Sequence, residues 1–224
     1  MQIIPAIIGK NIDEVAEQIE LVENFVEWVQ IDIMDGLFSP VEGWPFVNIK
    51  DGPENLEYID FVRTDSVKTE IHLMVNHPEK YLDKWIDVGV DRVLVHYESI
   101  SEKNLNYIID ELNNEEVEVG IALKLETPIE VVDKFIDQID VVQLMSIATI
   151  GAHGIPFEER VYDKIKSLRA KYPGVTIEVD GGVSLGNAKK LMEAGADNLV
   201  VGSAIFKSED IAKTIGEFKK LVEK

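Results

Sequence analysis

Short apolar runs alternate with stretches of helical spacing along the whole chain, and this alternation restricts the fold more than any other feature. Eight runs of strand length are separated by loops and amphipathic segments. Strands that alternate with helices predict parallel pairing through right-handed crossovers. The eight expected strands are Ile3–Ile8, Val29–Met34, Val67–Val75, Asp91–His96, Val117–Leu123, Ile139–Met145, Val175–Asp180 and Asn198–Val201.

Several of the intervening segments carry helix-start signals. Asn11 and Glu14 form a capping-box pattern at the start of a helix expected over Ile12–Val22. Pro78 suits the first position of a helix that reaches Val88. Thr127-Pro128-Ile129-Glu130 supplies a cap, a first-turn proline and a capping glutamate. Further helices are expected over Glu54–Arg63, Ser101–Asn113, from Pro156 to Lys171, Leu185–Ala194 and Ser208–Val222.

Eight strand–helix units without a linker predict one domain over residues 1–224, folded as a closed (β/α)8 TIM barrel. The length agrees, because such barrels commonly run to this size undivided. An open doubly wound sheet is the alternative. It is disfavoured because no G-x-G-x-x-G fingerprint follows the first strand.

Charge and composition exclude several classes of partner. The formal net charge is −20, whereas nucleic acids and anionic membranes are bound by clustered Lys and Arg. No apolar run approaches the roughly 20 residues that cross a bilayer, and no secretory signal is visible at the start. The absence of cysteine removes disulfide and thiolate chemistry. We therefore expect a cytoplasmic protein that binds neither nucleic acid nor membrane.

Ionisable side chains fall at the ends of three expected strands. Asp32, His72 and Asp180 lie toward the carboxyl ends of the second, third and seventh strands. In a TIM barrel the carboxyl ends of the strands form the active-site rim. Taken singly, each residue also has a structural explanation, as a loop cap or a satisfied core histidine. Their joint placement on one rim favours a functional site.

Glycine turns follow the last two strands and predict a phosphate site. Gly181 and Gly182 end the seventh strand, and Gly202 and Ser203 end the eighth. Glycine permits close backbone approach, and free N–H groups at a helix start attract anions. In many barrels these two loops bind phosphate. A pair of tight turns without a ligand is the structural alternative.

The chain resembles the ribulose-phosphate 3-epimerases from Ile3 to Phe206. The resemblance is carried by Asp32-Ile33-Met34-Asp35-Gly36, His72-Leu73-Met74-Val75, Gly120-Ile121-Ala122-Leu123, Met145-Ser146, Val179-Asp180-Gly181-Gly182-Val183 and Gly202-Ser203-Ala204-Ile205-Phe206. It implies a TIM barrel of the ribulose-phosphate-binding type that converts D-ribulose 5-phosphate to D-xylulose 5-phosphate.

The resemblance also implies a mechanism and a set of site residues. Asp32 and Asp180 would exchange protons on opposite faces of the substrate, through an enediolate. One divalent metal, zinc, iron or manganese, would be held by Asp32, His72 and Asp180, with Gln30 as a weak fourth ligand, and would stabilise the enediolate charge. The residues implied to line the sugar-phosphate site are Ala6, Met34, Met74, Met145, Gly151, Gly154, Gly181, Gly182, Gly202 and Ser203.

The sequence departs from the family pattern at several site positions. Gln30 stands where the family has its first metal-binding histidine, and an amide oxygen is a weaker ligand than imidazole. Ala6 replaces a serine. The loop Thr149–Pro156 has fewer glycines than usual and contains His153. Gln143 replaces an apolar residue, and we expect its amide to hydrogen-bond to Gln30 because a buried amide needs partners.

Two other functions stay open at this point. The chain could act on another ketose phosphate, such as a ketohexose 6-phosphate, or bind a sugar phosphate without catalysis. The two retained carboxylates favour an enzyme over a binding protein. We also expect a homo-oligomer, with Trp44 and Phe46 as exposed residues of a loop that serves a partner subunit or covers the site.

Overall fold

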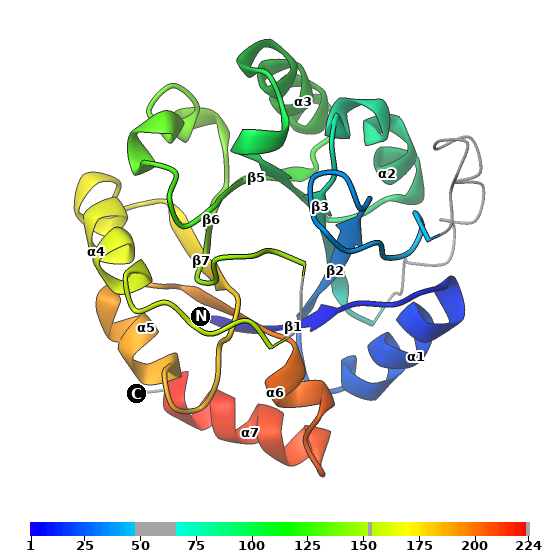
Figure 1. Ribbon diagram of the computed structural model, residues 1–224, viewed down its shortest axis with the longest axis vertical. Coiled ribbons are helices and arrows are strands. Elements are labelled where there is room, and N and C mark those ends of the chain that lie inside the picture. Colours follow the sequence, from blue (N-terminus) through cyan, green and yellow to red (C-terminus); the bar gives the residue numbers. More distant parts are fainter. Residues whose placement is uncertain (48–65, 152–153, 223–224) are drawn as a thin grey trace.

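Eight parallel strands form a closed barrel in the computed structural model, which describes residues 1–47, 66–151 and 154–222 (Figure 1). Each strand pairs with its sequence neighbours, and β8 pairs with β1 to close the barrel. The predicted TIM barrel is therefore confirmed. The strands are β1 (Gln2–Ile7), β2 (Trp28–Met34), β3 (Lys68–Met74), β4 (Arg92–His96), β5 (Glu118–Leu123), β6 (Val141–Met145), β7 (Thr176–Asp180) and β8 (Asn198–Val201).

Helices surround the barrel on its outside (Figure 1). They are α1 (Ile12–Val22), α2 (Leu82–Val88), α3 (Glu102–Asn114), α4 (Val161–Lys171), α5 (Ala188–Ala194), α6 (Ser203–Phe206) and α7 (Ile211–Val222). Asn11 caps α1 as expected, because its side chain accepts the backbone N–H of Glu14. The helix expected over residues 54–63 and the loop residue His153 lie outside the described residues. Within the described ranges no helix has the length and apolar character that spanning a membrane requires.

Between β5 and β6 the structure has short 3-10 turns where the sequence predicted a helix start. These are η5 (Ile129–Val132) and η6 (Ile136–Gln138). Buried Ile129, Val132 and Phe135 recur every three residues, which matches the three residues per turn of a 3-10 helix. Shorter 3-10 turns also occur at η3 (Pro78–Lys80) and η4 (Tyr97–Ser99).

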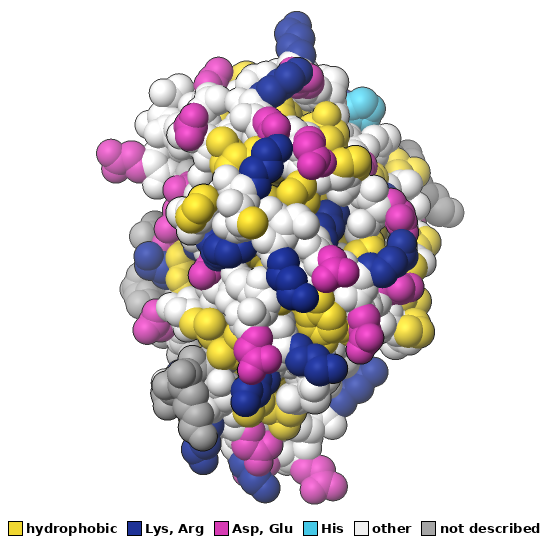
Figure 2. All heavy atoms as spheres, turned by 90° about the vertical axis from the view of Figure 1, so that its left-hand side faces the viewer, with side chains coloured by type: hydrophobic (Ala, Val, Ile, Leu, Met, Phe, Trp, Pro, Cys, Tyr) yellow, Lys and Arg dark blue, Asp and Glu magenta, His cyan; other side chains and the backbone are white. Residues whose placement is uncertain are grey.

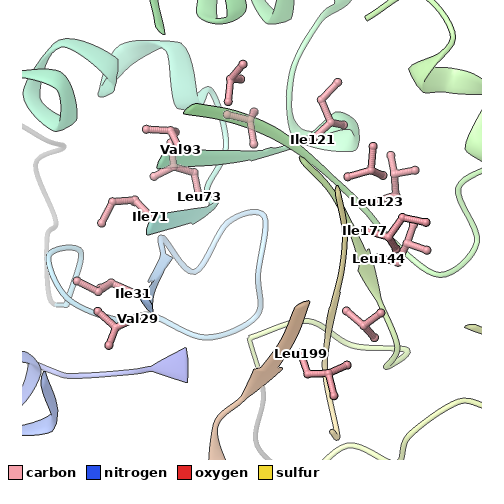
Figure 3. Close-up of a cluster of buried hydrophobic side chains, with 14 of the residues drawn as sticks. Val29, Ile31, Ile71, Leu73, Val93, Ile121, Leu123, Leu144, Ile177 and Leu199 are labelled. Atoms are coloured by element: carbon pink, nitrogen blue, oxygen red, sulfur yellow. The ribbon is translucent and has the colours of Figure 1, made fainter. Parts of the chain in front are cut away.

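The outward faces of the strands are apolar and build the main core. Residues such as Val29, Ile31 and Ile71 point away from the barrel axis and pack with helix residues (Figure 3). The core forms because side chains alternate along each strand, so every second residue meets the ring of helices. The sequence alternation in β2 thus assigns Gln30 and Asp32 to the inside.

The inside of the barrel is unusually polar. Its buried polar side chains include Gln30, Glu70, Arg92, Gln143, Glu178 and Asn198. Arg92 contacts Glu70 at 2.6 Å, Glu118 at 2.5 Å and Glu178 at 3.6 Å. Burial raises the pKa of Glu70 and of Glu178. A buried carboxylate without a counter-charge destabilises the folded state, and the Arg92 guanidinium supplies that counter-charge here.

Trp44 and Phe46 are buried, so the prediction that they are exposed is wrong. The Trp44 ring meets Trp85 edge-on with centroids 6.2 Å apart, and Phe46 meets Tyr81 at 5.1 Å. Edge-to-face pairs of this kind stabilise a packed cluster. These two residues attach the chain after β2 to the α2 region rather than offering a free surface.

On the face shown in Figure 2, Lys and Arg side chains are interspersed with Asp and Glu. Hydrophobic side chains there are scattered between the charged ones. Mixed charge of this kind is typical of a solvated surface.

Candidate functional site

Three strands bring Asp32, His72 and Asp180 together at their carboxyl ends. Asp32 and His72 are direct register partners on β2 and β3, and Asp180 is the last residue of β7. His72 Nδ1 lies 3.1 Å from Asp32 Oδ1 and 3.5 Å from Asp180 Oδ2. All three side chains are buried. The structure therefore unites the three ionisable residues that the sequence assigned to one rim.

The three side chains offer a donor set that suits a divalent cation. One ligand atom from each lies within 4.8 Å of the others. Two carboxylates and one imidazole are ordinary ligands for zinc and similar ions, and three protein ligands leave a coordination position open, as in catalytic sites. The residues present therefore fit the metal that the resemblance implied.

Gln30 faces this cluster with its amide nitrogen. Gln30 Nε2 lies 2.7 Å from Asp32 Oδ1, 3.3 Å from His72 Nδ1 and 3.4 Å from Asp180 Oδ2. Its Oε1 accepts a hydrogen bond of 2.6 Å from Gln143 Nε2. The expected contact between the two glutamines is thus confirmed. An amide N–H is a donor and cannot ligate a cation.

The pKa values of two residues in the cluster are raised. Desolvation, followed by the charge of Asp32, raises the pKa of Asp180 to about 7. Burial acts to lower the pKa of His72, but Asp32 and Asp180 outweigh it and the pKa is raised. A carboxyl group with a pKa near 7 can hold or release a proton at neutral pH, which suits acid–base chemistry.

His96 is a site residue that sequence reasoning missed. It ends β4 on the inner face, and its Nε2 lies 2.9 Å from His72 Nε2. Its Nδ1 lies 3.1 Å from the Glu98 carboxylate. The signal was present, because alternation along Asp91–His96 places His96 on the same face as Arg92.

The His96–Glu98 pair fixes the tautomer of His72. The Glu98 carboxylate accepts a hydrogen bond from the N–H group at His96 Nδ1. In the neutral His96 ring, Nε2 is then a hydrogen-bond acceptor. Burial lowers the pKa of His96 to about 4, which keeps the ring neutral at pH 7. His72 therefore donates from Nε2, and its neutral form turns the Nδ1 lone pair toward the two aspartates. Such outer partners orient metal ligands.

Glu98 is itself held as an acceptor by several donors. It accepts the Thr127 hydroxyl and the Lys124 backbone N–H as well as His96. Burial acts to raise its pKa, but these hydrogen bonds outweigh burial and lower the pKa to about 2. The loop after β5 is thus tied to the end of β4 through one carboxylate.

A cavity opens beside the cluster at the same end of the barrel. Asp32 and Asp180 lie on its wall with Ala6, Met74 and Met145. Met34 is fully buried next to these methionines and packs in one cluster with them. Met74 and Met145 therefore form an apolar part of the cavity wall, and Ala6 contributes a methyl group where a serine would contribute a hydroxyl.

The glycines expected to bind phosphate line this cavity too. They come from the ends of β7 and β8 and from the loop after β6: Gly151, Gly154, Gly181, Gly182 and Gly202, with Ser203 beside them. A Cβ on Gly202 would lie 3.5 Å from Ala6, another residue that lines the cavity. Ser203 begins α6, the short extra helix after β8. This is the place where barrels of this class commonly hold phosphate.

Residues 146–151 and 154–160, between β6 and α4, lie across this end of the barrel (Figure 1). The two ends of this segment pair as a β-bridge between Ile147 and Phe157. Ser39, in the loop after β2, hydrogen-bonds to the Ile150 carbonyl at 3.4 Å. The described parts of the loops after β2 and β6 therefore contact each other at this end of the barrel.

Comparison with known proteins identifies the relatives of this chain. The model of the ribulose-phosphate 3 epimerase family matches residues 2–206. A chloroplastic ribulose-5-phosphate-3-epimerase of Arabidopsis thaliana is 36% identical over 96% of this chain and 75% of that protein. The ribulose-phosphate 3-epimerase of Bacillus subtilis is 32% identical over 98% of both chains. That of Schizosaccharomyces pombe is 34% identical over 88% of this chain and 83% of its own.

Solved structures of other enzymes share the fold. A 3-keto-L-gulonate-6-phosphate decarboxylase from Vibrio cholerae superposes with a TM-score of 0.76 at 12% identity, covering 99% of this chain and 97% of that one. A 3-hexulose-6-phosphate synthase from Salmonella typhimurium gives a TM-score of 0.74 at 15% identity, covering 100% and 99%. At these identities the similarity describes the barrel and not the reaction.

Proposed function

Because the chain belongs to the ribulose-phosphate 3-epimerase family, and is therefore an isomerase, we propose that it interconverts D-ribulose 5-phosphate and D-xylulose 5-phosphate. The observation that carries this proposal is the meeting of Asp32 and Asp180 with His72 beside one cavity. Epimerisation beside a ketone needs a base on one face of the carbon and an acid on the other. Two carboxylates from β2 and β7 supply such a pair.

Proton transfer is assigned to the two aspartates. In one direction Asp32 first removes the proton at C3, and Asp180, in its protonated form, then delivers a proton to the opposite face. The pKa of Asp180, raised to about 7, supports its service as a proton donor near neutral pH. The intermediate between the two transfers is an enediolate. In the reverse direction the two residues exchange roles, as microscopic reversibility requires.

A divalent cation belongs to this proposal, held by Asp32, His72 and Asp180. When bound, it would supply Lewis-acid stabilisation of the negative charge on the substrate oxygens. His72 contributes its Nδ1 in the tautomer that His96 and Glu98 maintain. The identity of the ion, among zinc, iron and manganese, is part of what the experiment must determine.

Substrate orientation is assigned to the cavity walls. The backbone at Gly181, Gly182 and Gly202, with Ser203, would hold the phosphate through N–H groups. Met74 and Met145 would pack against the sugar carbons and exclude water. Binding the phosphate at a fixed distance from the two carboxylates places C3 between them. The phosphate contacts would raise the rate mainly through this positioning.

The test is exchange of the C3 proton of ribulose 5-phosphate with solvent deuterium, followed by NMR with and without added Zn²⁺, Fe²⁺ or Mn²⁺. We expect exchange accompanied by inversion to xylulose 5-phosphate, and faster exchange with the ion that occupies the site. Absence of exchange with every ion, while inorganic phosphate still binds, would refute this substrate. The same assay with a ketohexose 6-phosphate would then show whether the altered loop after β6 selects a longer sugar.

A further inference from the structure

Two glutamines bridge opposite walls of the barrel directly below the Asp32–His72–Asp180 cluster. Gln30 lies on β2 and Gln143 on β6, with three strands between them in either direction around the barrel. Both side chains are fully buried. Their amides meet in a hydrogen bond of 2.6 Å from Gln143 Nε2 to Gln30 Oε1.

The hydrogen bonds of the pair show which end of the Gln30 amide faces the cluster of Asp32, His72 and Asp180. Gln143 Nε2 donates both to Gln30 Oε1 and, at 3.0 Å, to Glu178 Oε1. Glu178 also accepts from Asn198 at 3.2 Å. Gln143 offers its NH2 group to both oxygens, and Gln30 presents its Oε1 to that group. The other end of the Gln30 amide, Nε2, therefore faces the cluster.

The Gln30 N–H groups therefore point at the three atoms that would bind a cation. Gln30 Nε2 lies within 2.7–3.4 Å of one atom from each of Asp32, His72 and Asp180. Ligand atoms approach zinc-like ions at about 2.0–2.2 Å. A cation at that distance from the same three atoms would meet the positive end of the Gln30 amide, so the cation and this NH2 group compete for one position.

We propose that Gln30 is a hydrogen-bond donor that opposes cation binding rather than a cation ligand, and that Gln143 is the positioning residue that holds it so. This inference rests on the proposed function, which places a divalent cation at Asp32, His72 and Asp180. It adds that the chain binds its cation less tightly than its three ligands alone would allow. The Gln30 amide links the two aspartates when no cation is bound.

The decisive experiment is a titration with Co²⁺, followed by its visible absorption, on the full-length protein and on Gln30→Ala. If Gln30 were a ligand, its removal would weaken binding. On the present proposal Gln30→Ala removes a competitor, and a water can take its place as a ligand. We expect Co²⁺ affinity to rise about tenfold, as the loss of one hydrogen bond to a charged group implies. An affinity that falls or does not change would overturn the proposal.

Gln143→Met tests the positioning role separately. It removes the donor that holds Gln30 Oε1, so Gln30 is free to turn its oxygen toward the cation, and we expect tighter Co²⁺ binding in this variant as well. In a Gln30→Ala background the same change should have no effect, because nothing is left to position. An equal effect of Gln143→Met on Co²⁺ affinity in both backgrounds would show that Gln143 does not act through Gln30.

Two controls separate this inference from the function on which it rests. Gln138→Met, at an exposed glutamine, should leave Co²⁺ affinity unaltered. Asp180→Asn should abolish the binding gained by Gln30→Ala. Binding to none of the variants would overturn the cation site itself, whereas binding that weakens in Gln30→Ala would overturn only the role given to Gln30. If Gln143→Met does not fold, the direction of the change in Co²⁺ affinity in Gln30→Ala still decides whether Gln30 opposes cation binding.

Discussion

At the scale of single residues, the site consists of charged groups whose burial is offset by specific neighbours. His72 contacts both Asp32 and Asp180, and a second line of contacts runs from His72 through His96 to Glu98. Each of these side chains thus has a neighbour that determines its protonation state or its orientation. Mutations at this scale should separate chemistry from binding.

Asp32→Asn and Asp180→Asn should each lower kcat by a factor of about 10²–10⁴, the usual range for loss of a positioned acid or base. Asparagine keeps the shape but neither removes nor delivers a proton. Inorganic phosphate binding, measured by calorimetry, should be nearly unaltered because the phosphate contacts lie elsewhere. Asp163→Asn, at a side chain that is 89% exposed, serves as the control. A variant at either site residue that retains its turnover would remove that residue from the mechanism.

Glu98→Gln should destabilise the fold at neutral pH and much less in acid. The folded-state pKa of Glu98, about 2, lies below its ordinary value of 4.5, so its stabilisation is fully present above pH 4.5 and is lost as the pH falls toward 2. The shift corresponds to roughly 3 kcal/mol at pH 7 as an upper limit. Urea unfolding at pH 7 and at pH 3 measures both values.

The matched change Glu126→Gln removes a carboxylate that is 76% exposed and should alter stability by less than about 0.5 kcal/mol at either pH. If Glu98→Gln behaved in the same way, the hydrogen bonds to Glu98 would not contribute to stability.

Sequence reasoning located Asp32, His72 and Asp180 because each is a polar residue at the end of an apolar strand. It also paired Gln30 with Gln143, since two inward-facing amides in a barrel need partners. It missed His96, although the strand pattern faced that residue inward, and it placed Trp44 and Phe46 at the surface. The aromatic residues could not be placed from sequence because their burial depends on Trp85 and Tyr81, which lie on a different strand–helix unit.

At the scale of elements, strand positions were predictable and helix beginnings were less so. Strands are identified by period-two alternation, which the closed barrel enforces on every strand. Helix starts depend on local hydrogen bonds that composition does not reveal. The helix expected from Leu185 begins as α5 at Ala188, because Ser184 and Asn187 form a turn in which the Asn187 side chain accepts the Ser184 N–H. The segment after Thr127 follows the three-residue spacing of its buried side chains instead of the α-helical spacing.

The turns after β7 and β8 should respond differently to an added methyl group. Gly202→Ala meets only ordinary contacts, 3.5 Å from Ala6, so its thermal unfolding midpoint should match that of the wild type. Its methyl group should weaken phosphate binding and raise KM about tenfold with little change in kcat, as loss of a uniform binding interaction does.

Gly181→Ala should instead lower stability by roughly 1–3 kcal/mol. Its φ is +110°, and a Cβ there would lie 2.7 Å from Ile147. Differential scanning calorimetry and steady-state kinetics on both variants distinguish the two roles. A destabilised Gly202→Ala protein with an unaltered KM would contradict the assignment of Gly202 to the phosphate.

At the scale of the whole molecule, charges inside and outside the barrel have different consequences. Inside, Arg92 lies among Glu70, Glu118 and Glu178 and stacks over the Trp28 ring at 4.0 Å. It joins β4 to the neighbouring strands and, across the barrel, to β7. Outside, the excess of carboxylates gives the molecule its net charge of −20.

Arg92→Met should lower the free energy of unfolding by about 3–5 kcal/mol, because it leaves buried carboxylates without their counter-charge. Adding Glu70→Gln should restore part of the loss, since one of those carboxylates is then neutral. Lys134→Met removes an exposed partner of Glu102 and should cost less than about 1 kcal/mol. Chemical denaturation of the variants provides the comparison, and equal effects at positions 92 and 134 would show that the interior ion pairs do not support the barrel.

Raising the ionic strength from about 10 to about 150 mM should increase kcat/KM by a few-fold. The negative field of the molecule opposes the approach of an anionic sugar phosphate, and salt screens that field over a Debye length of about 8 Å at the upper value. Stopped-flow or steady-state kinetics at fixed pH measures the effect, with sucrose in place of salt as the control for general solvent effects. A decrease in kcat/KM would mean that a local positive field at the cavity governs substrate approach.

The bridge between Gln30 and Gln143 also limits how the chain can evolve. The two positions are 113 residues apart in sequence, yet each amide is the other's partner in the barrel. In the cation-free protein, a lineage that replaced Gln143 alone by an apolar residue would leave Gln30 Oε1 buried without its donor, at a cost of about 1–3 kcal/mol. That cost is a large share of the stability of an ordinary protein. The two glutamines should therefore be inherited together or lost together, and relatives that carry one should carry the other.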